Sequence, residues 1–303
     1  MHLPTLRQLQ FLCALADEKS FSRAADICNV TQPTLSSAIK EVEAILGVQL
    51  VEREARGASL TRAGEAAVER ARAILSAAAD LVAAAHQAGT PLTGPFHLGA
   101  IPTLAPYLLP RTMSALRASH PDLKLYLRED QTDRLLDALR NRTLDAALIA
   151  LPWESPGIET EVLGDDEFLF VGPCDHRLST VNSLKPDDLQ GEDVLLLEDG
   201  HCLREQAVSV CSFSPTGATS DVAATSLATL VQMVAGGLGV SLLPKIAADA
   251  GVAAGTDVSI RAFDTPVIGR QIGIAWRAGS PREAEARLIG ESVRKSLAER
   301  SEA

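Results

Sequence analysis

The chain has 303 residues, 46% of them hydrophobic, so it is long enough for sizeable buried cores and for about two domains. Its formal net charge of −11 argues against binding of nucleic acid over the whole surface, because such binding depends on Lys and Arg near the phosphates. No basic segment followed by an apolar run opens the sequence, and Asp80 and His86 interrupt the Ala-rich stretch at 73–88, so we expect a cytoplasmic protein with no membrane partner.

The start of the chain predicts two short helices. Apolar residues recur with a helical period over 6–16. Ser20 or Ser22 offers an N-cap for a second helix, which ends near Asn29, a residue that tolerates a left-handed turn. Over 1–62, seven basic residues balance seven acidic ones. The acidity therefore belongs to the remainder of the chain and does not exclude DNA binding by this segment.

A third helix is predicted to begin after Thr31, a good N-cap, and to end at Gly47. Only a few residues join it to the second helix, which is typical of a helix-turn-helix whose second member enters the major groove of DNA. Short strands at 49–53 and 58–61 predict a wing. The polar start of the third helix and the wing supply the candidate DNA-binding residues Thr31, Gln32, Pro33, Thr34, Ser36, Ser37 and Arg53.

A long Ala-rich helix is expected from Arg62 to Gln87, and Gly89, Thr90 and Pro91 end it. Its periodicity alone fits a core helix of one domain equally well. Its position between two differently patterned regions favours a linker helix that pairs with another subunit.

Beyond Gly94 strand and helix patterns alternate, which favours an α/β architecture with parallel strands. The strand candidates are Phe96–Ile101, Leu123–Arg128, Ala146–Ala150, Glu167–Val171, Val194–Leu197, Val240–Leu243 and Ile272–Trp276. The helix candidates are Leu104–Ala118, Asp133–Asn141, Leu203–Val210, Ser226–Ala235 and Pro281–Glu299.

An odd number of cysteines argues against a structural disulfide framework and favours a transient, regulatory disulfide in a reducing cytoplasm. The five are Cys13, Cys28, Cys174, Cys202 and Cys211. Cys202 follows a predicted strand and would lie in the first turn of a helix, where the dipole and free amides favour a thiolate. His201 and Arg204 are near enough in sequence to add positive charge or a hydrogen bond. The alternative is a buried, inert thiol in a strand–helix turn.

The front of the chain carries a specific set of residues: Leu6, Leu9, Phe11, Phe21, Ala24, Ala25, Val30, Thr31, Gln32, Pro33, Thr34, Leu35, Ser36, Leu46, Gly47, Leu50, Arg53, Leu60, Thr61 and Gly64. In this set the chain resembles the LysR-type family of bacterial transcriptional regulators. The resemblance implies an N-terminal all-α winged helix-turn-helix at 1–61 and a long linker/dimerisation helix at 62–92. It further implies a C-terminal α/β regulatory domain at 93–303, with two lobes like those of periplasmic binding proteins.

The same resemblance divides the regulatory domain. Lobe I would comprise about 93–165 and 269–303, and lobe II about 166–268. The chain would cross between the lobes near 163–167 and again near 263–270. The alternation of strands and helices is compatible with this division.

A second set of residues lies in this domain: the run Leu197–Ala207 followed by Cys211, together with Ile101–Thr103 and Pro106–Pro110. In this set the chain resembles the peroxide-sensing members of the family. The resemblance implies that hydrogen peroxide oxidises Cys202, which then forms a reversible disulfide with Cys211. It also implies that Thr103, Thr132 and His201 hold the peroxide and that Arg270 polarises the site.

The spacing of Cys202 and Cys211 has a mechanical consequence. If both belong to one helix, their Cα atoms lie roughly 13 to 14 Å apart, whereas a disulfide needs about 7 Å or less. Oxidation would then have to unwind the segment between them. Cys174 is the one rival partner. The spacings of Cys174, His176, His201, Cys202 and Cys211 match no common zinc pattern, so we expect no metal and no cofactor.

The sequence therefore predicts a homo-oligomeric regulator, a dimer of dimers by resemblance, that binds promoter DNA and engages RNA polymerase at antioxidant genes when peroxide oxidises it. It is not expected to be an enzyme. One alternative keeps DNA binding and replaces peroxide with a small metabolite held between the lobes. The other is a thiol peroxidase with Cys202 as the peroxidatic and Cys211 as the resolving residue.

Overall fold

The computed structural model describes residues 3–54, 57–86, 91–198, 203–204, 206–207 and 224–301. The chain divides near residue 89 into two compact units, which are described separately. No helix within the described ranges is both long and apolar enough to cross a membrane.

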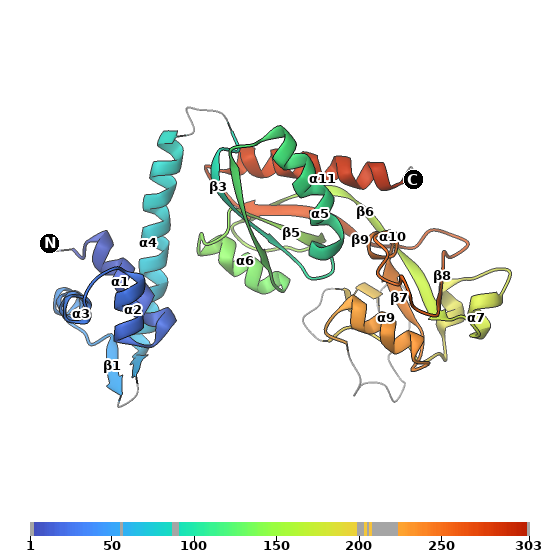
Figure 1. Ribbon diagram of the computed structural model, residues 1–303, viewed down its shortest axis with the longest axis horizontal. Coiled ribbons are helices and arrows are strands. Elements are labelled where there is room, and N and C mark those ends of the chain that lie inside the picture. The colour runs from blue at the N-terminus through green and yellow to red at the C-terminus, as the bar shows by residue number, and fades with distance from the viewer. Residues whose placement is uncertain are drawn as a thin grey trace. The chain divides into compact units, whose positions relative to one another are not determined.

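The first unit is a winged helix-turn-helix followed by a long helix (Figure 1). Its elements are α1 (Leu6–Glu18), α2 (Phe21–Ile27), α3 (Gln32–Leu46), β1 (Val51–Glu54), β2 (Gly57–Leu60) and α4 (Arg62–His86). The side chains of Thr5, Ser20 and Thr31 each accept a backbone N–H at the start of one of the first three helices. Strands β1 and β2 pair antiparallel. The predicted fold of this segment is confirmed, with the wing strands shifted by one or two residues.

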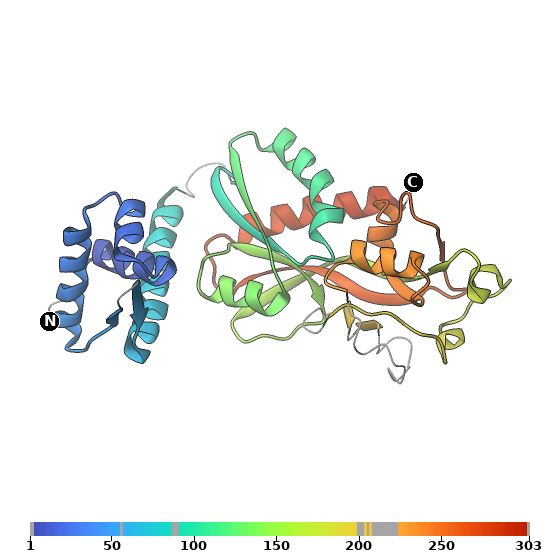
Figure 2. The ribbon, with the colours of Figure 1, turned by 60° about the horizontal axis from the view of Figure 1, so that its bottom comes forward.

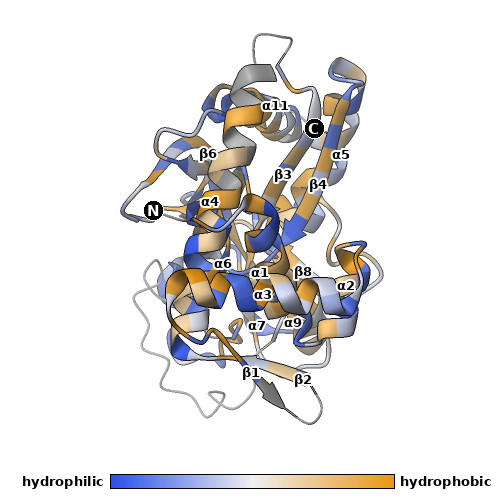
Figure 3. Ribbon diagram, turned by 90° about the vertical axis from the view of Figure 1, so that its left-hand side faces the viewer, coloured by the Kyte–Doolittle hydropathy of each residue, from blue (hydrophilic) through white to orange (hydrophobic). Residues whose placement is uncertain are grey.

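One apolar stripe of each helix forms the core of this unit. Leu12, Leu35 and Val42 are completely buried there. Hydrophilic and hydrophobic stretches alternate along α3, as expected of a helix with one buried face (Figure 3). Glu43 Oε1 accepts the backbone N–H groups of Leu50 and Val51 at 2.8 and 3.1 Å, which fixes the wing to the end of α3.

Gly64 in α4 packs directly against the segment that enters the wing. A Cβ at this position would lie 2.0 Å from the carbonyl oxygen of Leu50, which already accepts the N–H of Thr61 at 3.0 Å. We expect Gly64→Ala to lower the stability of this unit by about 2 to 3 kcal/mol, because backbone must move to admit the methyl group. Urea unfolding followed by circular dichroism measures this. Gly47→Asn, where φ is +67° and a Cβ meets nothing within 4 Å, is the control and should cost under about 1 kcal/mol; an equal midpoint for the two variants contradicts the close packing.

The second unit is built on one curved sheet with helices on both faces. Its strands are β3 (Gly94–Ala100), β4 (Leu123–Glu129), β5 (Ala146–Leu151), β6 (Ile158–Pro173), β7 (Ser241–Pro244), β8 (Val258–Arg261) and β9 (Ile268–Arg277). The helices whose bounds lie within the described residues are α5 (Ala105–Ser119), α6 (Thr132–Arg140), α7 (Arg177–Thr180), the 3-10 helix η1 (Pro186–Leu189), α9 (Leu227–Ala235), α10 (Lys245–Asp249) and α11 (Glu283–Ser301). Helices α5 and α11 lie side by side on one face of the sheet and α6 lies on the other (Figures 1 and 2).

The expectation of parallel strands is correct for only part of the sheet. The strand order is β4-β3-β5-β9-β6-β7, with β8 also on β6, and β3 is parallel to both of its neighbours. The pairs of β9 with β5 and with β6, and those of β6 with β7 and β8, are antiparallel. The long strand β6 is antiparallel to β9 over residues 158–167, and from Phe168 onward it is antiparallel to β7 and β8.

Two predicted strands differ in extent. The candidate 167–171 is the second half of β6, whose first half carries exposed residues and lacks an apolar pattern. The candidate 194–197 forms only two isolated bridges, Val194 with Val240 and Leu197 with Ala224. Each makes too few ladder hydrogen bonds to count as a strand.

Two hydrophobic clusters give this unit its two lobes. One surrounds β3, β5, α5 and α11, and the other surrounds β7, α9 and the second half of β6. Among the described residues, Tyr107 contacts both clusters, and the adjacent Ile246 and Ala247 of α10 are buried in the first and second cluster respectively. The two-lobed architecture is confirmed, and the lobe boundaries given above remain predictions.

Candidate functional site

The polar start of α3 faces outward. Thr31, Gln32, Pro33, Thr34 and Ser37 are exposed and Ser36 is half-buried. The Thr31 hydroxyl lies 2.8 Å from that of Thr34, and Gln32 accepts a hydrogen bond from Ser22 of α2 at 3.2 Å. Arg53 lies in β1, opposite Ala58, and its side chain is outside the described part. This face presents donors and acceptors of the kind that contact base edges and phosphates.

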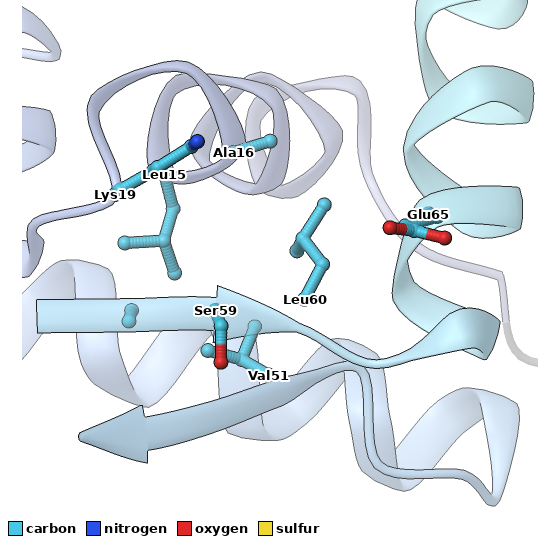
Figure 4. A pocket seen from close by; sticks show the side chains of 8 residues that line it. Leu15, Ala16, Lys19, Val51, Ser59, Leu60 and Glu65 are labelled. Carbon is cyan, nitrogen blue, oxygen red and sulfur yellow. The ribbon is translucent and has the colours of Figure 1, made fainter.

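Two hollows in the described residues lie away from the predicted peroxide residues. A pocket of about 250 Å³ lies between the end of α1, the wing and the start of α4, and its polar side chains Lys19, Ser59 and Glu65 lie apart from one another (Figure 4). A second hollow of about 590 Å³ lies between α5 and α11. Two serines lining it, Ser114 and Ser292, donate to carbonyl groups of their own helices.

Arg270 of β9 is the centre of a buried polar cluster. Its side chain is 0% exposed, and Nη1 donates to Thr103 Oγ1 at 2.6 Å while Nη2 donates to the Thr103 carbonyl oxygen at 3.1 Å. Nε and Nη2 each lie 2.9 Å from Oδ2 of Asp166, which is 2% exposed. A guanidinium group can only donate, so the Thr103 hydroxyl accepts from Arg270 and directs its own hydrogen elsewhere. The structure therefore brings together two of the residues that the resemblance implied.

Thr103 and Thr132 follow neighbouring strands at the same edge of the sheet. Ala100 of β3 pairs with Glu129 of parallel β4, and each threonine comes three residues later. The carboxyl ends of parallel strands are a usual place for ligands. Both threonines are nearly completely buried, and within the described residues the Thr132 hydroxyl has no hydrogen-bond partner. A buried hydroxyl needs a partner, and here the described part of the chain supplies none.

The predicted redox residues Cys202, Cys211 and His201 lie outside the described residues. Close by, Leu203 and Ala207 are helical and buried in the second hydrophobic cluster. Arg204 Nη1 donates to the carbonyl oxygen of Leu197 at 3.3 Å. Arg204 is thus tied to the end of the segment that leads to Cys202.

The other cysteines are free thiols with differing surroundings. Cys13 is buried, Cys28 is half-buried and Cys174 is exposed. Burial raises the pKa of Cys13, although nearby Arg72 opposes this. A hydrogen bond with Asp257 is the main cause that raises the pKa of Cys174. Because the thiolate is the reactive form, both surroundings reduce reactivity near neutral pH.

Two family models match the chain. "Bacterial regulatory helix-turn-helix protein, lysR family" matches residues 6–65, and "LysR substrate binding domain" matches residues 89–298, which is more than half of the sequence. The chain belongs to the LysR family. This is a family of transcriptional regulators and not of enzymes, so the thiol peroxidase alternative is wrong.

This LysR-family protein is similar to OxyR proteins over nearly its whole length. It is 39% identical over 289 residues to the "DNA-binding transcriptional dual regulator OxyR" of Escherichia coli, which covers 95% of this chain and 94% of the relative. A full-length OxyR variant from Pseudomonas aeruginosa superposes with a TM-score of 0.80 at 37% identity, covering 97% of this chain and 96% of that one. A hydrogen-peroxide-bound OxyR variant from Corynebacterium glutamicum has a TM-score of 0.68 at 37% identity, with 99% and 94% covered.

Sequence reasoning missed Asp166. It lies in the predicted crossing 163–167, but an acidic residue beside another acidic residue, Asp165, gives no sequence signal of burial. The structure shows that Asp166 is the buried partner of Arg270. Only the prediction that the two crossing segments lie near each other could have suggested that pair.

Proposed function

We propose that this LysR-family protein is a DNA-binding transcriptional regulator that senses hydrogen peroxide through Cys202 and Cys211. The buried contact between Arg270 and Thr103 carries the proposal. In this contact the Thr103 hydroxyl accepts a hydrogen bond from the buried Arg270, so its own hydrogen is directed away from that cation. A second buried hydroxyl, that of Thr132, follows the end of the neighbouring strand. Such an arrangement suits a small, uncharged ligand that both donates and accepts hydrogen bonds, and hydrogen peroxide is one. The similarity to OxyR proteins, one of them hydrogen-peroxide-bound, supports the same assignment.

The chemistry proceeds in two balanced steps. The Cys202 thiolate attacks one oxygen of hydrogen peroxide, so that an S–O bond forms as the O–O bond breaks and the sulfur loses two electrons. The other oxygen leaves as hydroxide and takes up a proton, and a hydrogen bond from Thr103 stabilises the charge that develops on it. Cys211 then attacks the sulfenic sulfur. The S–S bond forms, and the displaced oxygen leaves as water with the proton of the Cys211 thiol.

The remaining predicted residues have supporting roles in this proposal. Thr132 and His201 hold the peroxide with Thr103, and Arg270 polarises the site. Arg204, which is tied to the carbonyl group of Leu197, orients the segment that precedes Cys202. The raised pKa values of Cys13 and Cys174 disfavour those two thiols as the first to react.

The first unit binds promoter DNA through the start of α3. The exposed side chains of Thr31, Gln32 and Thr34, together with the wing residue Arg53, contact the duplex in this proposal. The bound regulator engages RNA polymerase at antioxidant genes when it is oxidised. Because its DNA partner is in the cytoplasm, we place the protein there.

The protein works as a homo-oligomer, a dimer of dimers. Support comes from α4, where the described side chains include three exposed, large apolar ones: Ile74 (49%), Leu81 (73%) and Val82 (56%). A soluble helix with such a surface is suited to pack against another helix. The linker-helix interpretation of 62–92 therefore remains our proposal in preference to a core helix.

The proposal is tested by mapping the cysteines after oxidation. We expect peptide mass spectrometry of the full chain, treated with about one equivalent of hydrogen peroxide per subunit, to find a disulfide between Cys202 and Cys211 as the main product. Peptides with Cys13, Cys28 and Cys174 should stay reduced. A main linkage from Cys202 to Cys174, or no oxidation of Cys202, contradicts the proposed pair.

A further inference from the structure

Asp166 is placed where the two lobes of the second unit are joined. It lies in β6 opposite Arg270 in β9, and a register shift follows immediately after this pair. The two oxygens of its carboxylate bind different parts of the unit. Oδ2 accepts from Arg270 in the other crossing strand, while Oδ1 accepts the backbone N–H of Ile246 in α10 at 3.0 Å. One carboxylate thus holds both long strands and the helix whose residues reach both hydrophobic cores.

The contacts of Asp166 determine the orientation of Arg270. Oδ2 binds Nε and Nη2, the two donors along one edge of the guanidinium plane. With that edge fixed, Nη1 is directed to the Thr103 hydroxyl and Nη2 also reaches the Thr103 carbonyl oxygen. The hydroxyl hydrogen of Thr103 is therefore directed through a chain of three side chains that begins at Asp166.

We infer that Asp166 is a positioning residue for the oxidation of Cys202. It fixes Arg270, and through Arg270 it directs the Thr103 hydroxyl to donate to the oxygen that leaves the peroxide. The second oxygen of Asp166 connects this orientation to α10. A change in how the lobes pack together would therefore change the direction of the Thr103 hydroxyl, which stabilises the leaving oxygen. The inference rests on the proposed function, because it needs peroxide to react at Thr103.

The test compares two reactions of the same thiol in the full chain. Hydrogen peroxide needs stabilisation of a leaving hydroxide, whereas alkylation by iodoacetamide expels iodide and needs no such hydroxyl. We expect Asp166→Asn to lower the second-order rate constant of Cys202 oxidation by roughly 10- to 100-fold, and to change the alkylation rate less than about threefold. Asp165→Asn is the matched control, since that neighbouring carboxylate binds the exposed Gln271 at 3.1 Å, and it should change neither rate.

A double-mutant cycle separates positioning from general damage. If Asp166 acts through Thr103, then Thr103→Val combined with Asp166→Asn should react with peroxide no more slowly than Thr103→Val alone. Equal losses of both peroxide and iodoacetamide reactivity in Asp166→Asn, or unchanged peroxide reactivity, overturn the inference. If Asp166→Asn does not fold by circular dichroism, Arg270→Lys replaces it. That variant keeps the positive charge but lacks the fixed, planar set of N–H donors of the guanidinium group. It should show the same selective loss of peroxide reactivity, and unchanged reactivity again overturns the inference.

The wild-type protein distinguishes this inference from the proposed function. If wild-type Cys202 reacts with iodoacetamide but not with hydrogen peroxide, the proposed function itself has failed. If wild-type Cys202 reacts rapidly with peroxide and Asp166→Asn does so equally, only the role of Asp166 has failed.

Discussion

Replacing Cys202 with Ser is expected to abolish the response to hydrogen peroxide completely. A serine hydroxyl keeps the shape of the thiol but is not ionised near neutral pH and cannot form a sulfenic acid or a disulfide. The measurement is the affinity for a DNA duplex selected from a random pool with oxidised wild-type protein. Oxidation of the wild type should change that affinity by roughly 5- to 150-fold, the range of ordinary allosteric coupling, whereas Cys202→Ser should give the same affinity with and without peroxide.

Two further variants sharpen this result. In Cys211→Ser, peroxide should oxidise Cys202 as fast as in the wild type. The reaction should end at the sulfenic acid of Cys202, which is detected by labelling with dimedone. Cys174→Ser should behave as the wild type in every respect, because its exposed thiol has a raised pKa and lies outside the proposed pair. If Cys202→Ser still responds in cells that meet peroxide, a small metabolite between the lobes is the better explanation of the signal.

The fold of the first unit could be predicted closely because its signals are local. Ser20, Thr31 and Gly47 mark helix ends by their own side chains or backbone, and the structure places ends at those residues. The sheet of the second unit was less predictable. Strand β6 passes from one lobe to the other, so its first half has a different environment from its second and carries no single periodic pattern.

The candidate site depends on contacts that no local pattern encodes. Thr103 and Arg270 are 167 positions apart, and Asp166 is 104 positions from Arg270. From sequence alone, a threonine after a strand predicts a helix cap, and a single arginine or aspartate predicts a charge on the surface. The resemblance to a known family could therefore name Thr103 and Arg270, whereas burial of the Asp166–Arg270 pair emerged only from the antiparallel pairing of β6 with β9.

Thr132→Val is expected to stabilise the second unit while it slows the oxidation of Cys202. Within the described residues the Thr132 hydroxyl is buried without a hydrogen-bond partner, and such a group costs the folded state about 1 to 3 kcal/mol. A valine fills nearly the same volume without that cost, so the free energy of unfolding should rise by about 1 kcal/mol. If the hydroxyl is kept to bind peroxide, the second-order rate constant of oxidation should fall by roughly 10-fold or more. Urea unfolding and thiol loss under peroxide measure the two quantities.

Thr103→Val is the matched comparison, since both threonines are nearly completely buried after neighbouring strands but only the Thr103 hydroxyl has a described partner. Loss of that hydroxyl leaves an Arg270 N–H unsatisfied, so this variant should be destabilised by about 1 to 3 kcal/mol as well as slowed. Opposite signs of the stability change at the two positions, with slower oxidation at both, distinguish a ligand-binding hydroxyl from a structural one. If Thr132→Val is less stable than the wild type and oxidised at the same rate, its hydroxyl serves the fold and does not bind peroxide.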